Sequence, residues 1–399
     1  MQVNSIKPVS FKAHYVNVDI GASSINGSMK IRTLDDKGNQ IDYYKTTVFD
    51  EGQRRSEQKM EQSIANKVAA SEYRNEGRIL KADPDNEVYL TVCYPGAKVS
   101  EEGQDGFRLS NFFYDDQRQN RFHRTIRPDN IDKYLAAQGV NIVQTRHVND
   151  MAGAGACILD KVQKEAPELL KEGEEILFLY PGGGLGSGFI TVDKNDIKIK
   201  PSEMQHARRS DDSGQSLEAD VGVPGFIGNF ADTLGMSEAE RKIIGNDARV
   251  PREFDVLDEY LPGRYTPAEH RYGSMIAINK FVDSLAEIIA MQICTNKLKS
   301  VVITGNVANG VKDVINKDEE NNITPSVDEF RQDGADKFTG YMRSRVCRKL
   351  TAVGNLLLPN PNELVIKCVE IKDNTEGAQV LQKCDEVGKP AKWYNMQDK

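Results

Sequence analysis

A carboxylate followed by small residues stands between two strand-like segments near the start of the chain. Asp19 lies in an alternating apolar run, the small residues 21–24 follow it, and a second strand-like run spans 29–33. Small residues in such a turn either serve a tight hairpin or let backbone amides approach a phosphate. These residues alone leave both interpretations open.

A second turn is much richer in glycine. Five of the seven residues in 182–188 are glycine, and apolar segments flank them. Glycine weakens strands, so this number exceeds what a hairpin requires. A phosphate-binding loop would explain it, because side chains would block the approach of an anion to the amides. A glycine-rich hairpin remains the alternative. The turn at 304–310 leaves a similar choice, because its small residues could lie under a nucleotide or form a tight βα turn.

Asn149 and Asp150 separate a predicted strand, which ends near Val148, from a predicted helix that opens with small residues. Asparagine and aspartate are both good helix N-caps. An aspartate at the end of a strand is also well placed to act as a general base. The pair therefore predicts either a cap or a catalytic carboxylate.

These candidate residues belong to an order of elements that occurs twice. Three strands, a helix and a strand are predicted first, and a strand, a glycine turn, two strands, a helix and a strand follow later. The predicted elements of the two copies span 16–20, 29–33, 42–49, 55–73 and 87–96, then 174–193 (two strands), 196–203, 275–293 and 300–305. Two similar α/β halves often bind a ligand in the cleft between them. We therefore expect an α/β fold of two domains with a central cleft.

Composition narrows the class of protein. The chain has 399 residues and a net charge of -8, which argues against a general nucleic-acid binder. No apolar run approaches the ~20 residues of a membrane span, and residues 1–15 lack the apolar core of a secretory signal. The six cysteines are scattered without a C-x-x-C pair, so we expect a cytoplasmic protein without structural zinc. The charged, proline-containing segment 240–266 is expected to be a surface excursion.

The order of these motifs resembles the sugar-kinase branch of the actin-like ATPase superfamily, and within it the ROK family of bacterial hexokinases. Residues 19–23 are similar to the family's Asp-x-Gly-Gly-Thr, and 182–188 to its Gly-Thr-Gly-x-Gly-x-Gly. The resemblance covers nearly the whole chain, with insertions near 240–270 and 318–335. It implies two ribonuclease H-like domains, 1–150 and 151–399, the first completed by a C-terminal helix near 375–390.

The resemblance also implies roles for individual residues. Asp150 would be the general base, and Asp19 would hold Mg²⁺ through water. The residues implied to contact the sugar are Asn111, Asn149, Asp150, Glu203, His206 and Glu218. The residues implied to bind ATP are Asp19, Gly21, Ser23, Ser24, Gly182, Gly183, Gly184, Gly186, Gly305, Asn306 and Asn309.

Several positions depart from the family pattern. The stretch 207–216 lacks the cysteine cluster of zinc-binding members, so His206 is expected to contact sugar and not metal. Gly183 and Ala22 replace a threonine and a glycine of the phosphate turns. The eighteen residues before Asp19 cannot hold the helix-turn-helix domain of the family's repressors.

The expected activity is therefore ATP-dependent phosphorylation of a hexose at its 6-hydroxyl, with glucose first. An N-acetylhexosamine, mannose or fructose is the alternative substrate, and a weakly catalytic sugar or nucleotide sensor is the alternative function. A homodimer with no nucleic-acid or membrane partner is expected.

Overall fold

A computed structural model describes the chain in thirteen stretches. They are residues 13–21, 26–50, 55–73, 78–82, 86–101, 103–114, 121–193, 196–202, 204, 216–318, 336–352, 363–371 and 374–386. These residues form two compact units. Unit 1 contains the chain up to Cys157 together with the C-terminal helix α11, and unit 2 contains the chain from Ile158 up to Lys372.

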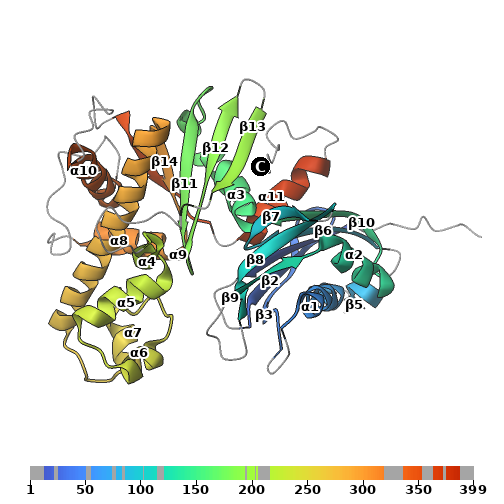
Figure 1. Cartoon of the computed structure of the whole chain (residues 1–399), viewed down its shortest axis with the longest axis horizontal. Helices are drawn as coiled ribbons and strands as arrows, with labels where there is room; N and C mark the ends of the chain where they lie inside the picture. Colours follow the sequence, from blue (N-terminus) through green and yellow to red (C-terminus); the bar gives the residue numbers. More distant parts are fainter. Residues whose placement is uncertain are drawn as a thin grey trace, which may run out of the picture. The chain divides into compact units, whose positions relative to one another are not determined.

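A five-stranded sheet with strand order β10-β6-β1-β2-β3 forms the centre of unit 1 (Figure 1). β1, β2 and β3 are antiparallel neighbours, whereas β6 and β10 run parallel to β1. The strands of this sheet are β1 Ala13–Gly21, β2 Ser28–Leu34, β3 Gln40–Thr47, β6 Glu87–Tyr94 and β10 Ile142–Asn149. Smaller sheets use β4 Glu72–Tyr73, β5 Arg78–Ile79, β7 Ala97–Glu101, β8 Gln104–Tyr114 and β9 Arg121–Ile126.

The two faces of this sheet differ. Val16, Val18 and Ile20 of β1 are fully buried and share a hydrophobic cluster with Met60 and Ile64 of α1. Alternate residues of β1 point to the opposite face, where α11 packs against β1 and β6. The helical segments of unit 1 are α1 Glu57–Ala69, η1 Leu80–Ala82, α2 Pro128–Ala137, the first half of α3 Asp150–Glu165, and α11 Asn374–Glu386.

Unit 2 repeats the same sheet. Its strand order is β13-β12-β11-β14-β15, with β11, β12 and β13 antiparallel and with β14 and β15 parallel to β11. The strands are β11 Glu175–Pro181, β12 Leu185–Asp193, β13 Asp196–Ser202, β14 Ser300–Ile303 and β15 Val365–Cys368. The duplicated order of elements predicted from the sequence is therefore confirmed.

Helices make up most of the remainder of unit 2. They are η2 Pro167–Leu169, α4 Glu218–Val221, α5 Val223–Thr233, α6 Glu238–Ile244, α7 Phe254–Tyr260, α8 Pro267–Asn296, α9 Asn306–Lys317 and α10 Lys337–Ala352. The helix predicted over 275–293 is confirmed, but it begins eight residues earlier. Thr266 and Glu269 form a capping box there and Pro267 takes the first helical position, which are the usual signals of a helix start.

The segment 240–266 is not the surface excursion that its charge and prolines predicted. It forms the end of α6, all of α7 and the turns around them. Val250, Leu257 and Leu261 are buried and join the main hydrophobic cluster of unit 2. Most of the charged residues are on the outside while every third or fourth residue is apolar, so composition alone concealed an amphipathic segment.

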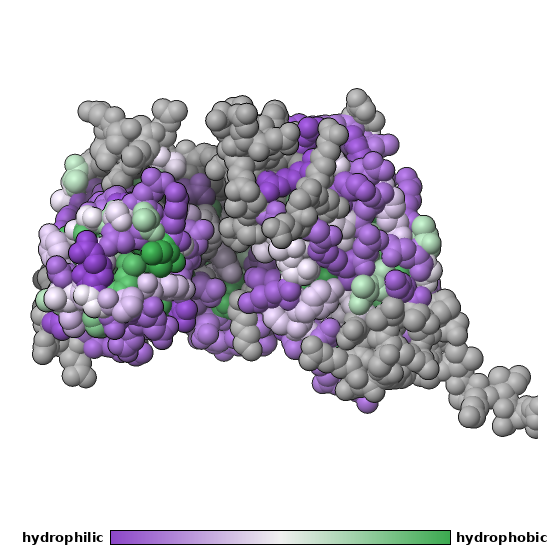
Figure 2. Space-filling model, turned by 90° about the horizontal axis from the view of Figure 1, so that it is seen from below, coloured by the Kyte–Doolittle hydropathy of each residue, from purple (hydrophilic) through white to green (hydrophobic). Residues whose placement is uncertain are grey.

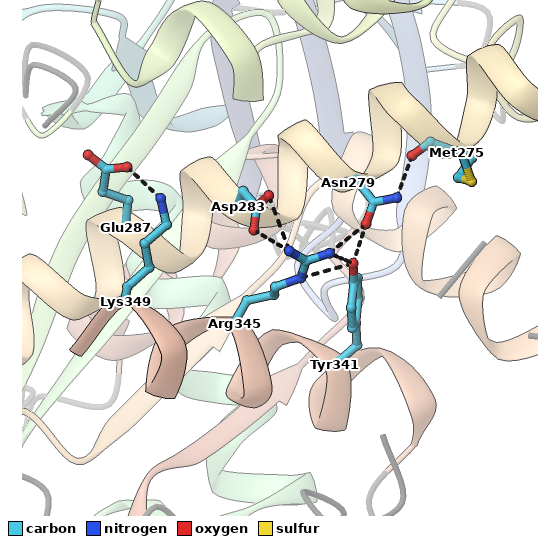
Figure 3. Close-up of polar contacts among 7 residues, drawn as sticks. All are labelled: Met275, Asn279, Asp283, Glu287, Tyr341, Arg345 and Lys349. Carbon is cyan, nitrogen blue, oxygen red and sulfur yellow. Dashed lines mark hydrogen bonds and ion pairs between the residues drawn. The ribbon is translucent and has the colours of Figure 1, made fainter. Parts of the chain in front are cut away.

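A row of charged and polar side chains joins α8 to α10 (Figure 3). Arg345 donates to Asn279 Oδ1 at 2.9 Å and pairs with Asp283 Oδ1 at 3.1 Å. Lys349 pairs with Glu287 at 3.0 Å. The partners are spaced four residues apart on each helix, so they line one face of each and fix α10 against α8.

The surface seen in Figure 2 is mainly hydrophilic, with small hydrophobic areas. The large hydrophobic side chains exposed among the described residues are Val143, Ile243, Tyr260, Tyr272 and Met291. In the described part of the chain, no helix combines the length and hydrophobicity needed to cross a membrane.

Candidate active site

Asn149 caps the helix that Asp150 begins. It is the last residue of β10, and its Oδ1 accepts a hydrogen bond from the backbone N–H of Met151 at 2.8 Å. Its Nδ2 donates to the carbonyl of Gly96 at 2.8 Å, which ties the turn after β6 to the end of β10. The capping role that either residue could have taken therefore belongs to Asn149.

Asp150 is left as the first residue of α3, with a partly exposed side chain. Its Oδ1 also accepts from the N–H of Met151, at 2.9 Å. β6 and β10 are parallel and both end here, so the carboxylate lies at the carboxyl edge of the sheet, where α/β proteins commonly bind ligands. The N-terminus of α3 is a favourable place for its negative charge.

A buried polar chain supports this edge of the sheet. Tyr94, the register partner of Asn149, lies 2.9 Å from His147 Nδ1, and His147 Nε2 lies 3.3 Å from Asp132. Burial raises the pKa of the Tyr94 phenol well above its usual value, so its hydroxyl stays protonated beside His147. Tyr94 also stacks on Phe107 with ring centroids 4.5 Å apart. The strand ends that carry Asn149 are thus held by side chains from α2, β8 and β10.

Asp19 lies near the end of β1, on the face of the sheet that α11 covers. Only 6% of the residue is exposed. Its Oδ2 pairs with Lys30 Nζ on β2 at 3.2 Å, and its Oδ1 accepts from Asn374 Nδ2 at 3.2 Å. Because Asn374 is the first residue of α11, the C-terminal helix positions a carboxylate near the start of the chain.

The helices that begin at Asp150 and Asn374 pack closely at two glycines. A Cβ on Gly377 would overlap the carbonyl of Gly153, and a Cβ on Gly153 would lie 2.8 Å from Cys93 Sγ. A larger residue at Gly377 would push the two helices apart, and one at Gly153 would have to displace the Cys93 side chain. The two carboxylates, Asp19 and Asp150, are therefore both positioned by the α3–α11 pair.

The glycine turn of unit 2 connects β11 to β12. Gly182 donates to the carbonyl of Gly184 at 2.7 Å, and the carbonyl of Gly182 accepts from Val223 N at 2.8 Å. A Cβ on Gly184 would overlap the Glu218 carboxylate, and one on Gly188 would overlap the Phe178 ring. Packing within unit 2 thus favours glycine at two of the five positions, whether or not a phosphate binds there.

Glu218 lies against this turn. Its Oε1 accepts from the backbone N–H of Leu185 at 3.1 Å. The residue begins α4, whose following turn also contacts the glycines, because the backbone of Gly222 lies beside Gly183 and Gly184. The structure therefore brings Glu218, implied as a sugar ligand, together with Gly182, Gly183 and Gly184, implied as phosphate ligands.

Gly305 holds the turn at 304–310 close to the glycine turn between β11 and β12. Its φ of +101° is a conformation that side chains disfavour, and a Cβ would clash with the carbonyl of Pro181. Asn306 follows as the exposed first residue of α9. Asn309 Oδ1 accepts from Cys368 Sγ at 3.3 Å, and burial raises the pKa of that thiol to about 12. The residues implied to bind nucleotide in unit 2 are therefore neighbours.

Some predicted site residues cannot be placed in this way. Ser23, Ser24, Glu203 and His206 lie outside the described residues, and Asn111 is described only as part of the backbone of β8. Gly21 ends β1, where its carbonyl accepts from Ser28 Oγ at 3.2 Å. Gly186 pairs with Tyr180 in β12. These seven residues gain no further support from contacts.

Two residues at the site were missed by sequence reasoning. Lys30 carries no motif of its own, but counting back along the β1–β2 hairpin could have placed it opposite Asp19. Asn374 gave a weaker signal, as a polar residue at the start of the predicted C-terminal helix. Only the folded structure shows that it reaches Asp19.

The residues present fit a magnesium ion that is held mainly by a nucleotide. No group of three or more His, Cys, Asp or Glu side chains capable of holding a metal occurs within the described stretches. Mg²⁺ usually keeps several waters and binds through one or two carboxylates plus substrate phosphates. Asp19 supplies such a carboxylate beside the turn that starts at Gly21.

No family model matches the chain, and no curated protein matches its sequence significantly. Solved structures do match. A glucokinase from Balamuthia mandrillaris in complex with glucose has a TM-score of 0.57 at 12% identity, covering 94% of this chain and 94% of that chain. A hexokinase from Schistosoma mansoni complexed with glucose has a TM-score of 0.52 at 13% identity, covering 92% and 85%. A ROK family glucokinase from Streptomyces griseus in complex with glucose and AMPPNP has a TM-score of 0.50 at 12% identity, covering 92% and 97%.

The chain shares its fold with these glucokinases and this hexokinase. The predicted fold class, α/β with two ribonuclease H-like domains, is therefore confirmed, and so is the predicted resemblance at the level of the fold. In this sugar-kinase fold, β1–β2 and β11–β12 are corresponding hairpins of the two units, and Asp150 follows the last strand of the first sheet.

Proposed function

We propose that this protein transfers the γ-phosphoryl group of ATP to a hexose, with glucose as the first candidate and glucose 6-phosphate as its product. One observation carries the proposal. In a sugar-kinase fold, Asp150 stands at the carboxyl edge of the first sheet while Asn149 caps its helix. The backbone thus places the carboxylate at the edge of the sheet where α/β proteins commonly bind ligands.

Asp150 acts as the general base. A hexose hydroxyl is a poor nucleophile, so a carboxylate accepts its proton as the oxygen attacks the γ-phosphorus. The new bond joins the 6-oxygen to phosphorus, and the bond to the β–γ bridging oxygen breaks. ADP leaves with the electron pair of that bond, and Asp150 holds the proton.

Each unit contributes residues that are proposed to bind the nucleotide. Gly21, Ser23 and Ser24 follow β1, and the turn 182–184 and Gly305 with Asn306 lie together in unit 2. Asp19 would hold Mg²⁺ through water. When bound, the ion neutralises charge on the phosphates.

The sugar is bound by Asn149, Asp150 and Glu218, with Asn111, Glu203 and His206 completing the set. Glucose is favoured because the spacing of Glu203, His206 and Glu218 looks like the glucokinase pattern, and because similar structures are glucose complexes by their descriptions. The proposal includes the homodimer that the resemblance implies.

A hexose panel tests the proposal. ADP release is followed by a coupled assay with glucose, mannose, fructose and N-acetylglucosamine, at saturating ATP and Mg²⁺. We expect turnover with at least one hexose and the highest kcat/KM with glucose. ATP and sugar binding without turnover for any of the four would instead show a sensor, and preference for another sugar would correct the substrate alone.

A further inference from the structure

A buried carboxylate lies two residues after Glu218, on the short helix that Glu218 begins. Asp220 belongs to α4, and only 5% of the residue is exposed. Its Oδ1 accepts a hydrogen bond from Asn229 Nδ2 of α5 at 3.0 Å, and its Oδ2 accepts one from Ser284 Oγ of α8 at 2.9 Å. Both carboxylate oxygens are therefore held, and they tie α4 to two longer helices.

A carboxylate is an expensive choice for this place. Burying one is costly unless its oxygens are hydrogen-bonded, and apolar side chains often fill such sites at lower cost. Leu217 and Val221, which lie before and at the end of α4, are fully buried in that way. At Asp220 the chain instead builds a polar network, which continues to the surface because Asn229 Oδ1 accepts from the exposed Lys280 at 2.9 Å. Burial alone does not explain this choice.

The helix α4 cannot fix its own position. It has four residues and no side-chain cap, and helices of this length are not stable by themselves. Residues two apart in a helix face different directions. Glu218 can therefore meet the N–H of Leu185 while Asp220 reaches α5 and α8. Apolar contacts are not directional and let a helix rotate, whereas two hydrogen bonds to one carboxylate fix its rotation.

The helix α8 gives this contact a firm support. Ser284 is 3% exposed and lies within the 30 residues of α8. Its neighbours in sequence, Asp283 and Glu287, pair with Arg345 and Lys349 and so tie α8 to α10 (Figure 3). One side of α8 is thus held by α10, and Ser284 holds α4 from another side.

We propose that Asp220 is a positioning residue for sugar binding. With Asn229 and Ser284 it fixes the rotation of α4 and so directs the Glu218 carboxylate at the hexose. This inference rests on the proposed function, which makes Glu218 a sugar ligand. Because Glu218 binds the hexose in the ground state and in the transition state alike, the loss of Asp220 raises the KM for glucose and leaves kcat close to that of the wild type.

Calorimetry and steady-state kinetics with glucose test this role. Asp220→Ala should weaken glucose binding by roughly 10- to 100-fold, as expected when a ligand-binding group is no longer oriented. The fall in kcat should be much smaller. Asp220→Asn should recover most of the affinity, because its Oδ1 can still accept from Asn229 and its Nδ2 can donate to Ser284 Oγ. If Asp220→Asn loses as much affinity as Asp220→Ala, the charge acts and not the hydrogen bonds, and the proposal is wrong.

Ser284→Ala and Ser274→Ala form a matched pair, which also decides the question if Asp220→Ala does not fold. Both serines are buried in α8 and donate one hydrogen bond, Ser284 to Asp220 and Ser274 to the carbonyl of Pro251. Both variants should lower the melting temperature to a similar extent. Only Ser284→Ala should weaken glucose binding, by about 2- to 10-fold.

A double variant tests whether the effect passes through Glu218. In a Glu218→Ala protein, Ser284→Ala should cause no further loss of glucose affinity, because no carboxylate remains to be positioned. A further loss of the same size there, or equal glucose affinity in Ser284→Ala and Ser274→Ala, would disprove the role of Asp220. A wild type that phosphorylates a hexose would leave the proposed function intact in either case. A wild type that binds no hexose would remove the proposed function and this inference together.

Discussion

The hairpins β1–β2 and β11–β12 occupy the same place in two sheets of identical strand order, yet they present different chemistry. At the first, Asp19 pairs with Lys30 and Asn374, so the hairpin offers charged side chains. At the second, the turn 182–184 offers backbone, and Glu218 is held against it by the N–H of Leu185. The same topology thus places a carboxylate at the first hairpin and leaves space around the backbone amides at the second.

This difference predicts that the two hairpins are sensitive to different kinds of substitution. A side-chain site should tolerate small changes of shape and fail when the charge is removed. A backbone site should tolerate changes of charge nearby and fail when a methyl group is added. The substitutions below test this division, from the largest expected effect to the smallest.

Asp150→Asn removes the proton acceptor from unit 1 and keeps its shape. If Asp150 is the general base, kcat should fall by about 10²–10⁴-fold, while glucose affinity measured by calorimetry should change little. Stability should not change, because Asn149 caps α3. Asp160→Asn is the control, since Asp160 lies on the same helix and pairs with exposed Lys164. A variant that keeps more than about a tenth of the wild-type turnover would exclude Asp150 from the mechanism.

Asp19→Asn removes the charge at the β1–β2 hairpin. The Mg²⁺ concentration for half-maximal activity should rise by roughly 10- to 100-fold, because the carboxylate no longer orients the water around the ion. ADP binding without Mg²⁺ should change much less. Asp50→Asn, which removes an exposed carboxylate that pairs with Lys67, should behave as the wild type. An unchanged Mg²⁺ requirement would show that Asp19 serves only its ion pair with Lys30.

Gly184→Ala adds a methyl group to the β11–β12 turn, where it meets the Glu218 carboxylate. Urea unfolding should show a loss of about 1–3 kcal/mol. In a Glu218→Ala background the same change should cost at least about 0.5 kcal/mol less, because the clash is gone. Gly305→Ala is the control, since its positive φ penalises alanine in either background. Equal costs for Gly184→Ala in both backgrounds would contradict the packing described for this turn.

The contributions of two carboxylates to stability should change in opposite directions as the pH falls. Glu61 in unit 1 accepts from Arg127 N and Asn130 Nδ2, and burial raises its pKa above 4.5. Its folded form therefore binds a proton more tightly than its unfolded form, so its contribution to stability grows as the pH falls towards 4.5. Glu240 in unit 2 is half-buried, and hydrogen bonds from Arg264 and Ser237 lower its pKa to about 2. Its contribution is complete above pH 4.5 and is lost as the pH falls towards 2.

Melting temperatures of Glu61→Gln and Glu240→Gln against the wild type should show these slopes. The advantage of the wild type over Glu61→Gln should increase between pH 7 and pH 4.5. Its advantage over Glu240→Gln should stay constant over that range and shrink below it. Parallel curves for the two variants would mean that one of these environments is misassigned.

Much of this molecule could be predicted from local pattern. The alternation around Val16 and the helical spacing of residues 275–293 predicted the repeated order of elements. Strands and helices each have a characteristic period of apolar residues, which can be read from neighbouring positions. The motif order then predicted the fold. The roles of Asp150 and Glu218 were implied by resemblance and stay predictions.

Contacts between distant residues could not be read in the same way. The division of labour between Asn149 and Asp150 depends on where Gly96 lies, and the close packing of Gly153 with Gly377 depends on how two helices cross. The prediction for the segment 240–266 was wrong because its few apolar residues are buried by packing with α8, which lies later in the chain. In each case the deciding partner is set by packing and not by the neighbouring sequence.

The position of α11 has a consequence for how the protein is made. Asn374 meets Asp19 across 355 positions of sequence, and unit 2 lies between them in the chain. On a ribosome, where domains generally fold as they emerge, β1 leaves the tunnel long before the helix that covers its polar face. The first residues of unit 1 are therefore synthesised before unit 2, and its last helix is synthesised after unit 2. One face of its central strand stays uncovered until almost the whole chain has been made. Chains released before residue 374 would lack the Asn374 contact to Asp19, so they should be the natural targets of chaperones and proteases.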